Sequence, residues 1–208
     1  MSIRERLSRS LSVNNEGPNK TLAAEIVQTA DAESINELIS LLQDEHTDVV
    51  ADTLKVLEMV GLKLPALVGP QAEQVFELLN HPSNKIQWRA MCVLSSIAHE
   101  CPKFLEAHLP KILEVMDNGT VITRDHGVKI LLALYPAIAT TPGLLLDQIQ
   151  RAPDNQLGQY AEKWATVITP EDVADLILIL ENRLKDLHHP SHQKRISRVL
   201  KKLHKKRQ

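Results

Sequence analysis

The closest approach to a metal-binding cluster in this chain is a group of three histidines, His188, His189 and His192. Zinc sites need three or four convergent ligands, commonly with cysteine or carboxylate partners at a fixed spacing. These histidines fall in a polar turn between two expected helices, without Cys or carboxylate at ligand spacing. We therefore expect a solvated loop, and we expect neither a metal ion nor another cofactor.

Motifs for nucleophilic or phosphate chemistry are missing from the sequence. It contains no His-Glu-x-x-His, no Gly-x-Ser-x-Gly and no glycine-rich phosphate loop. Cys92 and Cys101 are the only cysteines, which is too few for a disulfide framework and is typical of a reducing compartment. We expect a protein that is not an enzyme and that is cytoplasmic.

No segment has the pattern of a membrane or export signal. Residues 1–17 are polar and lack the apolar core of a secretory signal. The longest nearly apolar run, residues 130–139, is interrupted by Pro136 and is too short to cross a bilayer. We therefore expect no transmembrane segment.

Positive charge is concentrated at the C-terminal end. Residues 191–208 carry eight Lys/Arg and no Asp/Glu, whereas the other 190 residues have a net charge of −10. The basic candidates for contact with an anionic partner are Lys194, Arg195, Arg198, Lys201, Lys202, Lys205, Lys206 and Arg207. Two interpretations stay open: a capping helix with a solvated basic face, or contact with nucleic-acid phosphates, an anionic membrane or an acidic protein.

The elements that position these side chains are indicated by a sequence block that recurs about every 37 residues. Leu42, Leu79 and Met116 end three successive amphipathic stretches and are 37 residues apart. A polar turn and a second amphipathic stretch follow each of them. Such a period predicts stacked helix pairs, in which each pair buries its apolar face against its neighbours.

The expected fold is all-α, an α-solenoid of about five antiparallel helix-pair repeats. We assign residues 1–30 to N-terminal capping helices and residues 31–208 to the repeat array, ending in the basic helix. The approximate repeat boundaries are 31–65, 66–102, 103–142, 143–170 and 171–208. We expect close helix crossings where small residues recur, at Thr53, Ala90 and Gly127.

Residues 41–54 resemble a HEAT repeat. They contain the paired Leu41 and Leu42, Asp44 in the turn between the helices, and valines before a small residue and a leucine stripe. The third copy, from Val115 to Leu131, is similar, while the second has Asn80 in place of the turn aspartate. The resemblance covers about residues 31–205 and implies an armadillo/HEAT-like architecture. Proteins of this architecture serve as scaffolds, transport adaptors, nucleic-acid clamps and occasionally enzymes.

In a HEAT-like array the second helices line the concave face, where a ligand would lie. The candidate residues for binding a partner there are Asp52, Lys55, Lys85, Trp88, Arg89, His126, Lys129, Gln159 and Lys163. Either this is a mixed-charge groove for a protein segment, or it is an ordinary solvated helix face. Trp164 lies on the apolar stripe and should be core. Trp88 aligns with Ala51 and Asp125, a position that tolerates charge, so either a partly exposed or a buried Trp88 is open.

Three functions follow from these features. The first is a non-catalytic scaffold that binds another protein along the concave face. The second is nucleic-acid binding, because the resemblance extends to HEAT-like DNA glycosylases, which have a basic groove, tryptophans and a catalytic aspartate. Trp88, Arg124, Asp125 and Trp164 offer those residue types but not a matching spacing. The third is a structural subunit whose open end stacks on a copy of itself, although we favour a monomer.

Overall fold

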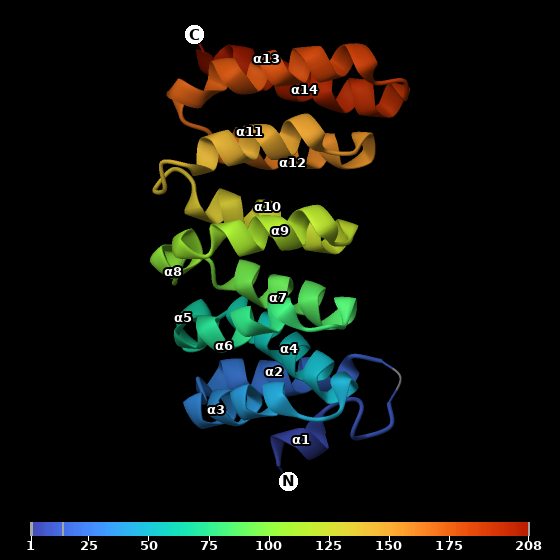
Figure 1. The fold of residues 1–208 in the computed structure, drawn as a ribbon, viewed down its shortest axis with the longest axis vertical. Helices are drawn as coiled ribbons and strands as arrows, with labels where there is room; N and C mark the ends of the chain where they lie inside the picture. The colour runs from blue at the N-terminus through green and yellow to red at the C-terminus, as the bar shows by residue number, and fades with distance from the viewer. Residues whose placement is uncertain (1, 14, 208) are drawn as a thin grey trace. The chain divides into compact units, whose positions relative to one another are not determined.

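The structure is a computed structural model that describes residues 2–13 and 15–207, and these residues form helices, turns and loops without a β-strand (Figure 1). The chain divides into two compact units, Met1–Ala133 and Leu134–Gln208. The predicted all-α class is confirmed.

Unit 1 contains three pairs of first and second helices, preceded by α1 (Ile3–Arg6) and α2 (Gly17–Thr29). The first helices are α3 (Ala32–Ser40), α6 (Ala72–Glu77), and the consecutive α8 (Pro102–Ala107) and α9 (Leu109–Asn118). The second helices are α4 (Thr47–Gly61), α7 (Asn84–Ser96) and α10 (Val121–Leu134), the last of which reaches the unit boundary. The short helix α5 (Pro65–Val68) and three 3-10 turns, η1 (Leu41–Gln43), η2 (Gly69–Gln71) and η3 (Leu78–Asn80), complete unit 1.

The second helices of unit 1 pack through the apolar stripe that the repeat predicts. In α4, Leu54, Leu57 and Val60 are fully buried, and α4 packs against both α2 and α7. Side chains spaced three and four residues apart share one helix face, which explains this pattern. A close helix crossing also occurs at Gly127 of α10, where an added Cβ would lie 2.1 Å from Cγ of Met116 in α9.

Two expected helices of unit 1 differ from the structure. The spacing of Ile3, Leu7 and Leu11 predicts a helix from Ser2 to about Ser12, but only α1 is helical and turns follow it. The apolar pattern of the third repeat predicts one helix from Phe104 to Met116, but the structure breaks it at His108 into α8 and α9. Pro110 has no N–H to donate to the carbonyl of Glu106, which accounts for the break.

Unit 2 is built from α11 (Thr141–Arg151), α12 (Asp154–Val167), α13 (Pro170–Asp186) and α14 (Pro190–Arg207). Helix α14 packs against α12 and α13, and α11 packs against α13. Trp164 is 0% exposed and meets the ring of Tyr135 edge to face, so its predicted core position is confirmed. Because proline ends or kinks a helix, Pro136 predicts a helix end near Tyr135, and α10 does end at Leu134.

Candidate functional site

The outward positions of α4, α7 and α10 form one surface of unit 1, which we call the second-helix face. Its side chains are Asp48, Asp52, Lys55, Lys85, Trp88, Arg89, His126 and Lys129. Lys85 and Lys129 are exposed and the other six are half-buried, so of the two alternatives for Trp88 the structure shows partial exposure. Cys92, which aligns with Lys55 and Lys129, is buried instead.

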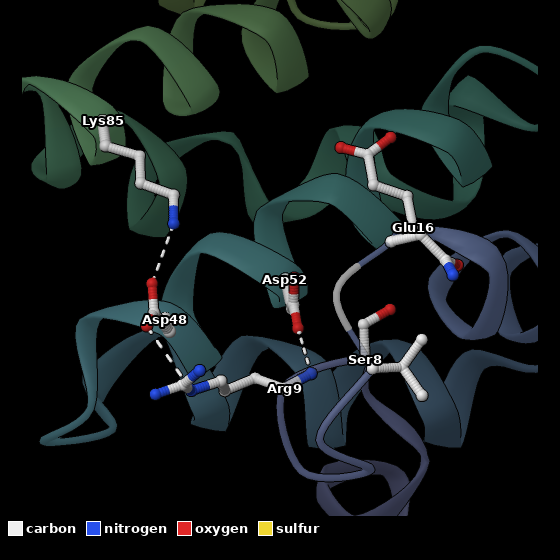
Figure 2. Close-up of a pocket in the computed structure, with 8 residues that line it drawn as sticks. Ser8, Arg9, Glu16, Asp48, Asp52 and Lys85 are labelled. Atoms are coloured by element: carbon white, nitrogen blue, oxygen red, sulfur yellow. Dashed lines mark hydrogen bonds and ion pairs between the residues drawn. The ribbon is translucent and has the colours of Figure 1, made fainter.

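Polar side chains connect successive second helices across this face. Lys85 of α7 donates from Nζ to Oδ1 of Asp48 in α4 at 2.8 Å, and the two residues are one repeat apart (Figure 2). This hydrogen bond and the charge of Lys85 lower the pKa of the Asp48 carboxyl. Oγ of Ser95 in α7 lies 2.6 Å from Nδ1 of His126 in α10. Three consecutive second helices therefore present a continuous polar surface.

The residues before α2 lie on the second-helix face, which the sequence did not predict. We call residues 8–13 and 15–16 the N-terminal segment. The backbone N–H of Arg9 donates to Oδ2 of Asp52 at 2.7 Å, and its guanidinium lies 3.5 Å from Oδ2 of Asp48 (Figure 2). The segment thus places a basic side chain between two aspartates of α4.

Glu16, at the end of the N-terminal segment, pairs with two of the four cations of the same face, Arg89 and Lys55. Its Oε1 accepts a hydrogen bond from Nη2 of Arg89 at 3.0 Å, and its Oε2 lies 3.8 Å from Nζ of Lys55. Burial raises the pKa of Glu16, but the Arg89 hydrogen bond and the positive charges of Lys55, Arg89 and Lys20 outweigh it, so the pKa is lowered. Glu16 is therefore held as a carboxylate.

A surface pocket of about 200 Å³ lies between the N-terminal segment and α4. It is lined by Ser8, Arg9, Val13, Asn15, Glu16, Asp48, Asp52 and Lys85 (Figure 2). Three carboxylates and two cations surround it, so its walls carry both signs of charge. Ser8 is held at its edge by a hydrogen bond of 2.9 Å from its N–H to Oδ1 of Asn19.

Helix α12 of unit 2 carries the remaining two candidates for binding a partner. Gln159 and Lys163 are both half-buried. The structure therefore divides the predicted partner-binding residues between the units, with seven in unit 1 and these two in unit 2.

The basic helix α14 buries its predicted apolar stripe, Ile196, Val199, Leu200 and Leu203. Arg195 is half-buried and pairs with Glu162 of α12, and Nζ of Lys206 donates to the carbonyl of Ala165 at 2.8 Å. The Arg195 hydrogen bond lowers the pKa of Glu162. The cations left exposed are Lys194, Arg198, Lys201, Lys202, Lys205, Lys206 and Arg207.

Of the three histidines, His188 and His189 precede α14 and His192 lies in its first turn, and the rings of His189 and His192 contact each other. Oγ of Ser191 lies 2.7 Å from Nδ1 of His189, whose ring centroid is 4.9 Å from that of His192. Among residues 2–13 and 15–207, no group of three His, Cys, Asp or Glu side chains is arranged to hold a metal ion.

Burial suppresses the reactivity of both thiols. It raises the pKa of Cys92 to about 12, with a contribution from Glu58, and the pKa of Cys101 to about 11, with a contribution from Glu100. Because the thiolate is the nucleophile, neither side chain has the environment of a catalytic cysteine.

The residue types of a DNA glycosylase are divided between the two units. Trp88, Arg124 and Asp125 are half-buried in unit 1, whereas Trp164 is enclosed in the core of unit 2. Trp164 is thereby excluded from stacking on a base. No helix in the described part of the chain is both long and apolar enough to cross a membrane.

Comparison with solved structures identifies the architecture. A designed armadillo repeat protein in complex with the peptide (KR)4 matches with a TM-score of 0.63 at 15% identity, covering 87% of this chain and 85% of that one. The fold is an armadillo/HEAT-like helical repeat. Two engineered proteins, Northeast Structural Genomics Consortium targets OR366 and OR329, match with TM-scores of 0.61 and 0.57 at 17% and 14% identity. They cover 98% and 99% of this chain, and this chain covers 99% and 98% of theirs. No protein-family model and no curated protein matches the sequence.

Proposed function

We propose that this protein is a non-catalytic scaffold that binds a segment of another protein along the second-helix face. The observation that carries the proposal is the N-terminal segment itself, a stretch of polypeptide that already lies on this face. It is held there through a backbone N–H on Asp52 and through side chains of both charges. A face that accommodates one polypeptide in this way has the donors, acceptors and charges to accommodate another.

The exposed part of the face continues beyond the N-terminal segment. Lys85 and Lys129 are exposed, and Trp88 is half-buried with the Arg89 guanidinium 4.8 Å from its ring centroid. Aromatic and arginine side chains at partly buried positions are common anchors in protein interfaces. The designed armadillo protein provides an analogy, since that protein is bound to a peptide.

Site-specific photo-crosslinking tests this proposal. A photoreactive amino acid replaces Lys129, on the second-helix face, or Lys103, an exposed residue of the first-helix segment α8, in cells that naturally produce the protein. We expect a discrete protein adduct from position 129 that reversing the charge of Lys85 weakens. Equal adducts from both positions, or adducts from position 103 alone, would contradict the proposal.

A second candidate function is nucleic-acid binding through α14. The observation that favours it is a row of exposed cations, Lys194, Arg198, Lys201 and Lys205, spaced three and four residues apart on one side of the helix. The apolar stripe of α14 faces the protein core and is not available for insertion into a membrane.

Fluorescence anisotropy with labelled duplex DNA and RNA tests this second function. Phosphate binding should weaken steeply as salt rises, because it releases condensed counterions. The double variant K201E/K205E should then bind much more weakly than the wild type. Absent binding, or binding that is insensitive to salt, would end this candidate.

A further inference from the structure

The contacts of the N-terminal segment differ in how easily they can be broken. The side chains of Arg9 and Glu16 are 65% and 39% exposed, so their ion pairs are partly solvated and weak. The flanking elements are anchored separately, through the buried Ile3 and Leu7 on one side and the buried Asn19 and Leu22 on the other. Ser8 is also buried and donates from its N–H to Asn19, so it stays with the anchored elements. Residues 9–13 and 15–16 can therefore leave the face while Ser8, α1 and α2 stay packed.

The cations that bind Glu16 cannot leave in the same way. The Arg89 side chain is only 11% exposed and is stacked on Trp88, and Lys55 is also largely buried. Lys55 keeps Glu58 as a second partner at 3.0 Å, but Glu16 is the only carboxylate paired with Arg89 among the described residues. Arg89 would remain on the face as a buried charge that requires a new anion.

Glu16 also leaves the hydrogen-bonding capacity of Arg89 incomplete. It accepts from Nη2, whereas Nε of Arg89 is buried and has no hydrogen-bond partner. Nε and Nη2 lie on the same edge of the guanidinium, which is the edge that binds carboxylates through two parallel hydrogen bonds. A carboxylate that approaches this edge squarely would make two hydrogen bonds where Glu16 makes one.

We propose that Lys55 and Arg89 form a carboxylate-binding site, that Glu16 occupies it in the free protein, and that an Asp or Glu side chain of a partner protein displaces Glu16. The inference rests on the proposed function, because it names the chemistry of the segment that binds the second-helix face. The N-terminal segment then acts as an internal competitor that a partner must outbind.

Binding of a labelled peptide that copies residues 7–18 of this chain tests the site. The peptide contains both Arg9 and Glu16, and its affinity is measured by fluorescence anisotropy against the full-length protein. In the E16A protein the site is vacant, so we expect the peptide to bind at least about tenfold more tightly than to the wild type. E106A, which removes an exposed glutamate of α8, is the matched control and should bind like the wild type.

Two further measurements establish that a carboxylate is recognised. A peptide with Gln in place of Glu16 should bind the E16A protein at least about tenfold more weakly than the original peptide. K55A in the E16A background should weaken binding as well, and it spares Arg89, whose replacement could disturb folding. Equal affinity of wild-type and E16A protein, equal affinity of the two peptides, or no binding to any variant overturns the inference.

Failure of this inference is distinguishable from failure of the proposed function. If the peptide binds the wild-type and E16A proteins equally but crosslinks still form from position 129, the face binds a protein without a carboxylate at Arg89. If no crosslink forms from the second-helix face, the scaffold proposal itself is wrong.

Discussion

Glu16 accepts a hydrogen bond of 3.0 Å from Arg89, although 73 residues of sequence separate them. The contact joins the residue just before α2 to α7, the second helix of the second repeat. It places an acidic side chain of the N-terminal segment on cations that the repeat pattern aligns along one face. The first part of that face is consequently occupied by the protein itself.

Removing the Glu16 carboxylate should loosen the N-terminal segment without unfolding unit 1. In E16A the Arg9 N–H, which donates to Asp52, should exchange with solvent faster, because the segment opens more often. Amides of α2 should be unchanged, since Leu22 and Ile26 keep the helix packed. Residue-resolved hydrogen exchange measures both, and unchanged exchange at Arg9 would show that Glu16 does not hold the segment.

Acid should open the same segment. The pKa of Glu16 is lowered in the folded protein by Arg89, Lys55 and Lys20 despite partial burial. Its contribution to stability is therefore fully present above its ordinary pKa of 4.5 and is lost as pH falls through the lower folded value. Fluorescence of Trp88, against which Arg89 is stacked, should report the change.

The matched control for the acid titration is E16Q. Asp44 and Asp48 also have lowered pKa values, the former about 2, so they titrate in the same acidic range. Subtracting the E16Q curve isolates the Glu16 step. If the wild type and E16Q give identical curves, the carboxylate of Glu16 has no role in closing the segment.

Both cysteines should be inert in the folded protein. With pKa values raised to about 12 and about 11, Cys92 and Cys101 are almost entirely protonated at neutral pH. Alkylation by iodoacetamide at pH 7.5 should be slow and should accelerate strongly in denaturant, as followed by mass spectrometry. Rapid modification of Cys92 without denaturant would reveal an activated thiol and reopen the question of catalysis.

Replacing Arg183 should destabilise unit 2. Its guanidinium donates to the carbonyls of Ile149, Gln150 and Ala152 and to Asp154, and its side chain is 12% exposed. It thereby satisfies carbonyls at the C-terminal end of α11. R183A should lower the free energy of unfolding by about 3 kcal/mol, since hydrogen bonds to a charged group are lost.

Chemical denaturation of unit 2 measures this loss. Lys185 lies on the same helix, is exposed and donates a hydrogen bond to Asn182, so K185A is the control and should change stability little. R183K should not restore the wild-type free energy of unfolding, because an ammonium group cannot donate to several carbonyls at once as the planar guanidinium does. Full rescue by lysine would contradict the role assigned to the guanidinium.

Replacing two helical glycines by alanine should change the stability of the protein in opposite directions. At Gly127 the new Cβ would meet the buried Met116 side chain, so G127A should destabilise the protein by about 1 kcal/mol through overpacking. At Gly143 of α11 nothing lies within 4 Å of the added Cβ, so G143A should stabilise by up to about 1 kcal/mol through helix propensity. Thermal unfolding compares them, and stabilisation by G127A would exclude a tight crossing.

The helices could be predicted from the sequence because their apolar residues recur at helical spacing. Leu54, Leu57 and Trp164 are buried as the stripe requires, and Trp88 lies off the stripe and is partly exposed. The division of one expected helix at His108 was missed because the apolar pattern continues through Pro110. Periodicity reports which face is buried, not where the backbone breaks.

The arrangement of the candidate site could not be predicted in the same way. The N-terminal segment is polar and aperiodic, so no local pattern indicated that Arg9 lies on Asp48 and Asp52 or that Glu16 reaches Arg89. The charged residues themselves could be read from the sequence. Which of them pair across 73 residues depends on how the chain folds. The carbonyl contacts of Arg183 were missed for the same reason, because backbone acceptors carry no sequence signal.

The most direct test of the scaffold account is the footprint of the partner recovered by crosslinking. Hydrogen exchange of the full-length protein is measured with and without that partner. The account predicts slower exchange in the second helices α4, α7 and α10 and faster exchange in residues 9–13 as the N-terminal segment is displaced. Protection confined to the first helices α3, α6, α8 and α9, with the second helices unchanged, would contradict it.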